Sequence, residues 1–231
     1  GAAGLTCHVR HDIPLTKTRL SVKKVSMNYT TLTGAKTVQG SIANWVNRSD
    51  LATVEILAET QSWIYQRLRV REMQARATLT FTTAAQTASL PSRFLDPISY
   101  TPYTWGDPLP LFHENALQDY RDDSGNLLSA VPSRWTIIGE TAYVDVLPIS
   151  TFTGILMYYA QPADLAATTN ETNFLTTRYP KLLRHACMAM AFEHMKDTDR
   201  AGGYMQLVEA DLQEAMRTND MYRRGQHVPR D

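Results

Sequence analysis

The stretch RWTIIGETAYVDVL, residues 134–147, decides the fold class. Apolar and polar residues alternate on both sides of a central Gly-Glu turn, and aromatic and β-branched residues are frequent, so the stretch predicts an antiparallel hairpin. Residues 154–160 predict a further strand, and the five prolines between Pro91 and Pro110 argue against helix there. We therefore expect a small antiparallel β subdomain over residues 77–162.

Helical periodicity precedes this region. Val38, Ile42, Trp45 and Val46 fall on one helical face, with Thr33 as a candidate N-cap. A second helix is predicted from about residue 51 to about residue 74. Its end is rich in arginine, which suits the negative end of a helix dipole.

Helical periodicity also follows the β region. Residues 163–177 read as a linker or a short helix, and Pro180 then suits the first turn of a helix that ends near Lys196. Asp197-Thr198-Asp199 predicts a turn and a cap, and the apolar stripe that follows predicts a last helix. Gly225 suits the position just beyond its end.

Together these patterns predict an α+β fold, a bundle of about four helices with an inserted antiparallel β subdomain. Residues 31–76 and 163–224 would form the bundle. Residues 1–30 would form an extended arm, and residues 225–231 a docking tail. Met27 also suits a chain start, which would make residues 1–26 an extension.

Charge is unevenly distributed in a chain whose formal net charge is zero. Residues 1–30 carry five basic side chains against Asp12, whereas residues 77–177 carry ten acids against three arginines. Such segregation suggests complementary contacts between copies or with partners. No apolar run is long enough to span a membrane, and two distant cysteines do not make a disulfide framework.

Two groups of polar residues could bind a metal ion, but each is explained more simply as exposed polar surface. Cys7, His8 and His11 are metal-type ligands but lack a fourth partner, which favours a polar arm. Asp119, Asp122 and Asp123 do not match a calcium loop and, with Ser-Gly-Asn behind them, fit an exposed turn.

The remaining candidates lie on predicted helices. His185 and His194 are nine residues apart on one helix and point to nearly opposite faces, which argues against a joint catalytic role. Cys187 lies on an apolar face and is expected to be buried. The alternating arginines of residues 67–71 could contact phosphate or pair with acids such as Glu72.

Several segments together resemble the head–tail adaptor, or connector, proteins of tailed bacteriophages. Their order and spacing carry the likeness, which covers about residues 31–226, outside the detail of 99–133. The segments are ANWVNRSDL at 43–51, RLRVREMQARA at 67–77, LPSRFL at 90–95, YYA at 158–160, LTTRYP at 175–180, MKD at 195–197 and NDMYRR at 219–224.

The resemblance implies a non-enzymatic structural protein of the virion that needs no cofactor or metal. Such adaptors form a ring, usually of twelve copies, beneath the portal protein and join it to a tail nozzle or tail tube. DNA passes through the middle without specific binding. We expect the protein at the head–tail junction, and in the host cytoplasm during assembly, with no membrane partner.

The resemblance also suggests site residues, because the C-terminal segment of such adaptors commonly docks on the portal. The docking candidates are Met221, Tyr222, Arg223, Arg224, Gly225 and His227. The acidic residues of the β region are candidates for the channel wall or for contacts between rings, or they simply solvate exposed loops. The residues singled out are Glu114, Asp119, Asp122 and Asp123.

Two other functions remain open at this point. One is a metal-assisted nuclease or hydrolase that uses the region of Asp119–Asp123 with histidines. The other is a DNA-binding accessory protein that uses the basic arm, which would show tight and salt-sensitive binding of DNA.

Overall fold

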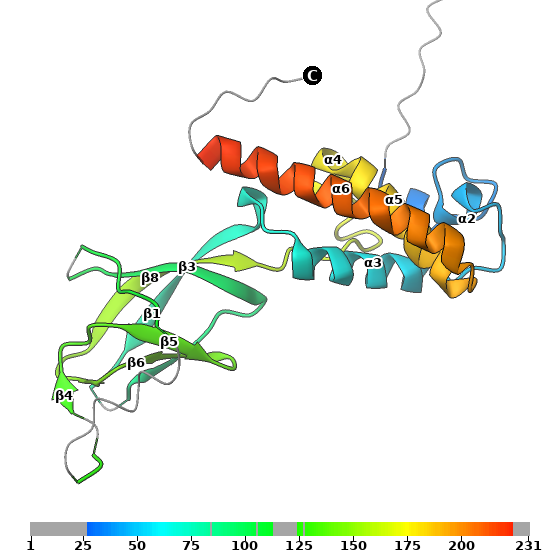
Figure 1. Ribbon diagram of the computed structural model, residues 1–231. Helices are drawn as coiled ribbons and strands as arrows, with labels where there is room; N and C mark the ends of the chain where they lie inside the picture. The colour runs from blue at the N-terminus through cyan, green and yellow to red at the C-terminus, as the bar shows by residue number, and fades with distance from the viewer. Residues whose placement is uncertain (1–26, 84, 105, 113–123, 127, 224–231) are drawn as a thin grey trace, which may run out of the picture.

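The computed structural model describes residues 27–223 except 84, 105, 113–123 and 127, and for residues 221–223 it describes the backbone alone. These residues form a helical body (27–73 and 161–223) and a β subdomain (74–160), which lie side by side (Figure 1). The mixture of helices and small antiparallel sheets confirms the α+β class.

Three long and three short helices build the helical body within the described ranges. Its core includes fully buried Ile56, Ile64, Leu183 and Val208. The helices are α1 (Tyr29–Leu32), α2 (Ile42–Trp45), α3 (Thr53–Arg67), α4 (Phe174–Arg178), α5 (Pro180–His194) and α6 (Thr198–Arg223), and a 3-10 turn, η1 (Arg71–Met73), follows α3.

The single helix predicted over residues 33–46 is wrong. Thr33 is the C-cap of α1 instead of an N-cap, and turns separate α1 from α2. Gly40 has a φ of 91°, a left-handed conformation that favours glycine, and Ser41 then caps α2 by accepting a hydrogen bond from the Asn44 amide at 3.0 Å. Two local caps thus override an apolar spacing that happens to match a helix.

The predicted second helix is also too long, since α3 ends at Arg67 and Leu68 is already extended. Leu68 and Val70 are both fully buried. Residues 67–71 alternate between arginine and apolar side chains, which is a period of two, and an extended backbone buries both apolar residues on one side. Arg71 and Arg76 therefore lie beyond the end of α3, in η1 and β1.

The predicted starts of the two last helices are confirmed, whereas Gly225 lies outside the described residues. Pro180 begins α5, and the Asp197 carboxylate accepts a hydrogen bond from the Arg200 amide at 3.2 Å, which caps α6. Lys181 of α5 pairs with Asp211 of α6, whereas Phe192 near the end of α5 lies under Arg200 near the start of α6. The two helices are therefore antiparallel neighbours, as their short connection predicted.

Two three-stranded antiparallel sheets build most of the β subdomain. One has the order β1-β8-β3 and the other β2-β6-β5, while β4 and β7 form a short parallel pair. The strands are β1 (Gln74–Phe81), β2 (Thr87–Ser89), β3 (Phe94–Pro102), β4 (Ser129–Ala130), β5 (Trp135–Ile138), β6 (Thr141–Val144), β7 (Leu147–Pro148) and β8 (Phe152–Ala160).

The predicted hairpin is β5–β6, in which Ile138 pairs with Thr141 across Gly139 and Glu140. Gly139 has a φ of 61°, which the tight two-residue turn requires. Trp135, 1% exposed, is the largest fully buried side chain described, and its indole donates a hydrogen bond to the Leu109 carbonyl at 3.0 Å. The hairpin thus supplies the centre of the β core.

Asp145 is the one buried acid among the described carboxylates of the β subdomain, at 1% exposed. It accepts hydrogen bonds from the amide and the hydroxyl of Ser133, at 3.1 and 2.6 Å, and Arg134 lies 3.8 Å away. Its carboxylate therefore fixes the entry into β5 and does not solvate a loop.

Replacing Asp145 by alanine is expected to lower the free energy of unfolding by about 2 kcal/mol, because hydrogen bonds to a buried charged group are lost. Urea unfolding followed by circular dichroism measures the change. Glu140→Ala is the matched control, since Glu140 is exposed at the hairpin tip. Equal midpoints for the two variants would contradict this role of Asp145.

Candidate functional site

The structure leaves most of the predicted site residues untested. Backbone positions 221–223 continue α6 to its end, so Met221, Tyr222 and Arg223 belong to a helix. Arg224, Gly225 and His227 lie outside the described residues, and so do the acids at 114, 119, 122 and 123. Their roles remain predictions.

The candidates for catalysis on the helices have structural partners. Cys187 is fully buried, as predicted, and burial raises the pKa of its thiol to about 12. His185 contacts Asp211 on α6 at 2.8 Å, while His194 contacts Glu59 on α3 at 2.8 Å. The two histidines thus face different helices, as expected from their nearly opposite positions on α5.

Asp211 ties α5 to α6 through both of its oxygens. One oxygen contacts His185 and the other lies 2.9 Å from the Lys181 ammonium. The hydrogen bond and the charge of Asp211 raise the pKa of Lys181 above its ordinary value. Because every polar atom of the cluster that is buried has a partner, the cluster serves to join two helices.

Neither a metal cluster nor a membrane span is found in the part of the chain that the structure describes. No three His, Cys, Asp or Glu side chains there come together as possible metal ligands. None of the helices described combines the length and the apolarity needed to cross a bilayer.

Several polar side chains meet at the junction between the helical body and the β subdomain. Its centre is residues 68–73, the segment that joins α3 to β1, which we call the hinge segment. The Arg69 guanidinium donates to the Tyr65 and Leu68 carbonyls at 2.8 and 2.9 Å and pairs with Asp96 of β3. The hinge segment is thereby tied to both sides of the junction.

The C-terminal end of α6 contacts the same hinge segment (Figure 1). The Asn219 side chain accepts a hydrogen bond from the Arg71 amide at 3.0 Å and donates one to the Arg69 carbonyl at 3.4 Å. From α4, Arg178 pairs with Glu72 at 2.9 Å. A small cavity of about 180 Å³ lies among Arg71, Glu72, Arg178, Tyr179, Thr218 and Asn219.

The sequence reasoning missed this junction, although one signal was available. Leu212, Ala215 and Asn219 follow one another at spacings of three and four on the buried stripe of α6. A polar amide that continues an apolar stripe predicts a buried hydrogen bond, because an unpaired amide would be costly there.

Exposed apolar side chains gather on the β subdomain. A larger hollow of about 1030 Å³ lies there between residues 89–97 and the β5–β6 hairpin, with Leu111 and Phe112 in its wall. Within the described ranges, the large apolar residues with at least a third of their surface exposed are Tyr103, Leu111, Phe112, Leu128, Val131, Ile138 and Ile149 on the β subdomain, and Val38, Val54 and Leu207 on the helical body. Seven of these ten side chains lie on the β subdomain, so most of the exposed apolar surface described belongs to that part.

Comparison with known proteins agrees with the resemblance seen in the sequence. No curated protein matches the chain. Residues 27–230 match the family model described as SU10 adaptor protein, which covers both the helical body and the β subdomain. The chain therefore belongs to the SU10 adaptor protein family, a family of phage head–tail adaptors.

Proposed function

We propose that the protein is a structural subunit of the phage virion that forms a ring between the portal protein and the tail nozzle or tail tube. The observation that carries this proposal is the family match over residues 27–230. In the proposed assembly twelve copies surround a channel through which DNA passes without specific binding. Assembly takes place in the host cytoplasm.

The arrangement of the two parts supports different contacts for the helical body and for the β subdomain. The helical body has a large continuous core and three long helices, which suits it to the wall between neighbouring subunits. The β subdomain carries most of the exposed apolar residues described, including Val131 and Ile149. We therefore assign contacts with the adjacent ring to the β subdomain.

Electron microscopy of the purified protein, alone and mixed with the portal of the same phage, tests the proposal. We expect closed rings on the portal, or in solution at high protein concentration. A protein that stays monomeric with the portal and cleaves DNA when a divalent metal is added would overturn the proposal. Tight, salt-sensitive binding of DNA by the monomer would favour the accessory-protein alternative instead.

The same images would place two further segments. Residues 27–30 belong to the helical body of their own chain, where Met27 and Tyr29 pack against its core and Thr30 bonds to Glu171. We propose that the rest of the arm, residues 1–26, packs on a neighbouring subunit, because its basic charge complements the acidic residues of 77–177. Glu114, Asp119, Asp122 and Asp123 are proposed to line the channel or a contact between rings, since a lumen rich in carboxylates would not hold DNA. Outward-facing carboxylates with lysine and arginine at the axis would reject this assignment and leave the ring intact.

Deleting Gly225–Asp231 is expected to leave a folded subunit that attaches poorly to capsids. The fold should survive because the buried stripe of α6 ends at Asn219 among the residues whose side chains are described. Circular dichroism and co-sedimentation with portal-bearing capsids measure the two properties. A variant with a Gly/Ser segment of equal length in place of residues 225–231 separates lost contacts from lost length. Normal attachment of both variants to capsids would show that residues 225–231 are not part of the docking surface.

A further inference from the structure

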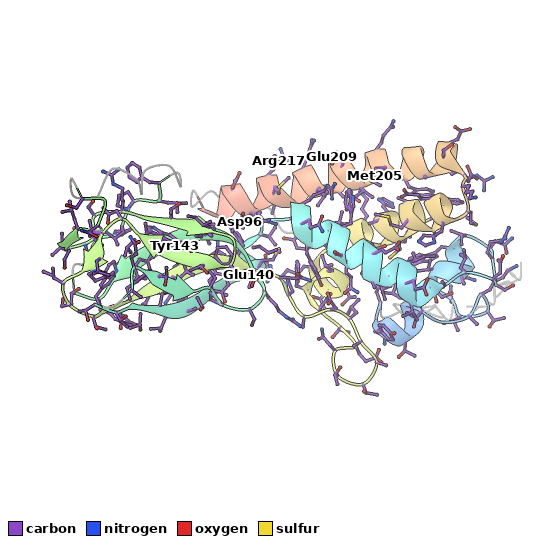
Figure 2. All side chains as sticks on the ribbon, turned by 90° about the horizontal axis from the view of Figure 1, so that it is seen from below. Asp96, Glu140, Tyr143, Met205, Glu209 and Arg217 are labelled. Carbon is purple, nitrogen blue, oxygen red and sulfur yellow. The ribbon has the colours of Figure 1, made fainter. Side chains whose placement is uncertain are left out.

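The contacts of Asn219 form a short chain that links the end of α6 to the β subdomain. The amide of Asn219 bonds to the backbone of Arg69 and Arg71, and the Arg69 side chain pairs with Asp96 on β3. Figure 2 shows Asp96 at the side of the β subdomain that faces the helical body, near the end of α6. Two hydrogen-bonding steps thus connect α6 with a strand.

Asparagine is suited to this position in a way that few side chains are. The amide offers a donor and an acceptor at once, and here it pairs with a C=O and an N–H two residues apart, as a neighbouring strand would. Asn219 is 5% exposed, and Val70 between its two partners is fully buried. Loss of the amide would leave backbone groups of the hinge segment without these bonds.

The hinge segment lies between the helical body and the β subdomain, so the bonds of Asn219 act on the connection between the two parts. Residues 68–73 are extended or form a single 3-10 turn, and their helical-type backbone bonds are confined to the two ends, from the Leu68 amide to Ile64 and from the Met73 amide to Val70. The segment is also one of the two chain connections between the helical body and the β subdomain. Its conformation therefore influences how the β subdomain is oriented.

From this geometry we infer that Asn219 is a positioning residue, which fixes the orientation of the β subdomain relative to the end of α6. A partner that binds the C-terminal end of α6 would then set the direction in which the β subdomain points. This second statement rests on the proposed function, because it takes the portal as that partner. The first statement holds for the isolated protein.

Spin labels on Glu209→Cys and Glu140→Cys measure the orientation, because both residues are exposed and lie on different parts of the molecule (Figure 2). Cys7 is replaced by serine, and buried Cys187 is left in place. We expect a narrow distribution of distances in the parent protein and a clearly broader one in Asn219→Ala. Hydrogen exchange at the Arg71 amide should become about two- to tenfold faster.

Two controls separate positioning from stability. Val208→Ala removes a fully buried side chain from the same helix, so it should lower the unfolding temperature but leave the distances narrow. Asp220→Asn changes an exposed neighbour of Asn219, and it should leave both the unfolding temperature and the distance distribution unchanged. Asn219→Asp keeps the acceptor for the Arg71 amide, so the width of its distance distribution should lie between those of the parent protein and the alanine variant. Unchanged distances and exchange in Asn219→Ala, or equal broadening in Val208→Ala, would overturn the inference.

Addition of the portal protein completes the test. The distance distribution should shift in the parent protein and fail to shift in Asn219→Ala, although both bind. An equal shift in both proteins would show that Asn219 does not carry the effect of the portal to the β subdomain. The positioning role of Asn219 would then be decided by the measurement in the isolated protein alone. Absence of portal binding in every variant would count against the proposed function alone.

Discussion

Replacing Gly154 by alanine is expected to lower the free energy of unfolding of the β subdomain by about 3 kcal/mol, the upper part of the range for overpacking. Gly154 lies on β8, the central strand of its sheet, opposite Leu79 and Pro102. A Cβ atom there would lie 2.6 Å from the Thr101 carbonyl oxygen and 2.8 Å from the Pro102 Cα atom. Both obstacles are backbone of a paired strand, which cannot move aside as a flexible side chain does.

Urea unfolding and hydrogen exchange of the β-strand amides measure this effect. Gly203→Ala is the matched control, because nothing lies within 4 Å of a Cβ atom at Gly203 on α6. Since glycine disfavours a helix interior, the control should gain about 0.5–1 kcal/mol. If Gly154→Ala unfolds at the same urea concentration as the parent protein, the strands are not as closely packed as described.

Replacing Trp135 by alanine is the second change with a large expected effect, about 3–5 kcal/mol of unfolding free energy. The indole is buried against the Tyr100 ring, with centroids 5.7 Å apart, and alanine would leave a cavity in the middle of the β core. Because tryptophan fluorescence changes with the mutation itself, circular dichroism is the better measure of unfolding.

Trp135→Phe separates packing from hydrogen bonding. Phenylalanine keeps a ring in the core but cannot donate to the Leu109 carbonyl, so its cost should be near 1 kcal/mol for the lost bond, with a small packing loss. The order alanine, phenylalanine, parent in increasing stability is expected. A phenylalanine variant as unstable as the alanine variant would show that the hydrogen bond, and not the ring, holds this region.

Local sequence patterns predicted those elements whose packing follows their own periodicity. The β5–β6 hairpin has alternation and a turn glycine, and α5 and α6 have long apolar stripes and recognisable caps. The run of alternating arginines at 67–71 follows α3 without glycine or proline, which favours a continued helix. Period two over five residues was the better guide, since Leu68 and Val70 are both buried.

The junction could not be predicted from such patterns. Asn219 and Arg71 are 148 residues apart, and no local rule pairs a side chain with a distant backbone amide. The position of Asn219 on the apolar stripe of α6 predicts a buried hydrogen bond but does not identify its partner. The candidate docking and channel residues remain predictions, because they lie at the end of α6, beyond it, or in residues 113–123.

The two chain connections of the β subdomain leave it at neighbouring points, because Gln74 at the start of β1 is paired with Tyr159 near the end of β8. Paired strands lie about 5 Å apart, a gap that two or three residues can close. A bridge from residue 73 to residue 161 would therefore restore a continuous helical chain that lacks from its apolar core only Tyr159 and the flanking Leu95 and Ile98. We therefore expect the rest of the subunit to keep its fold when the β subdomain is exchanged for another insertion.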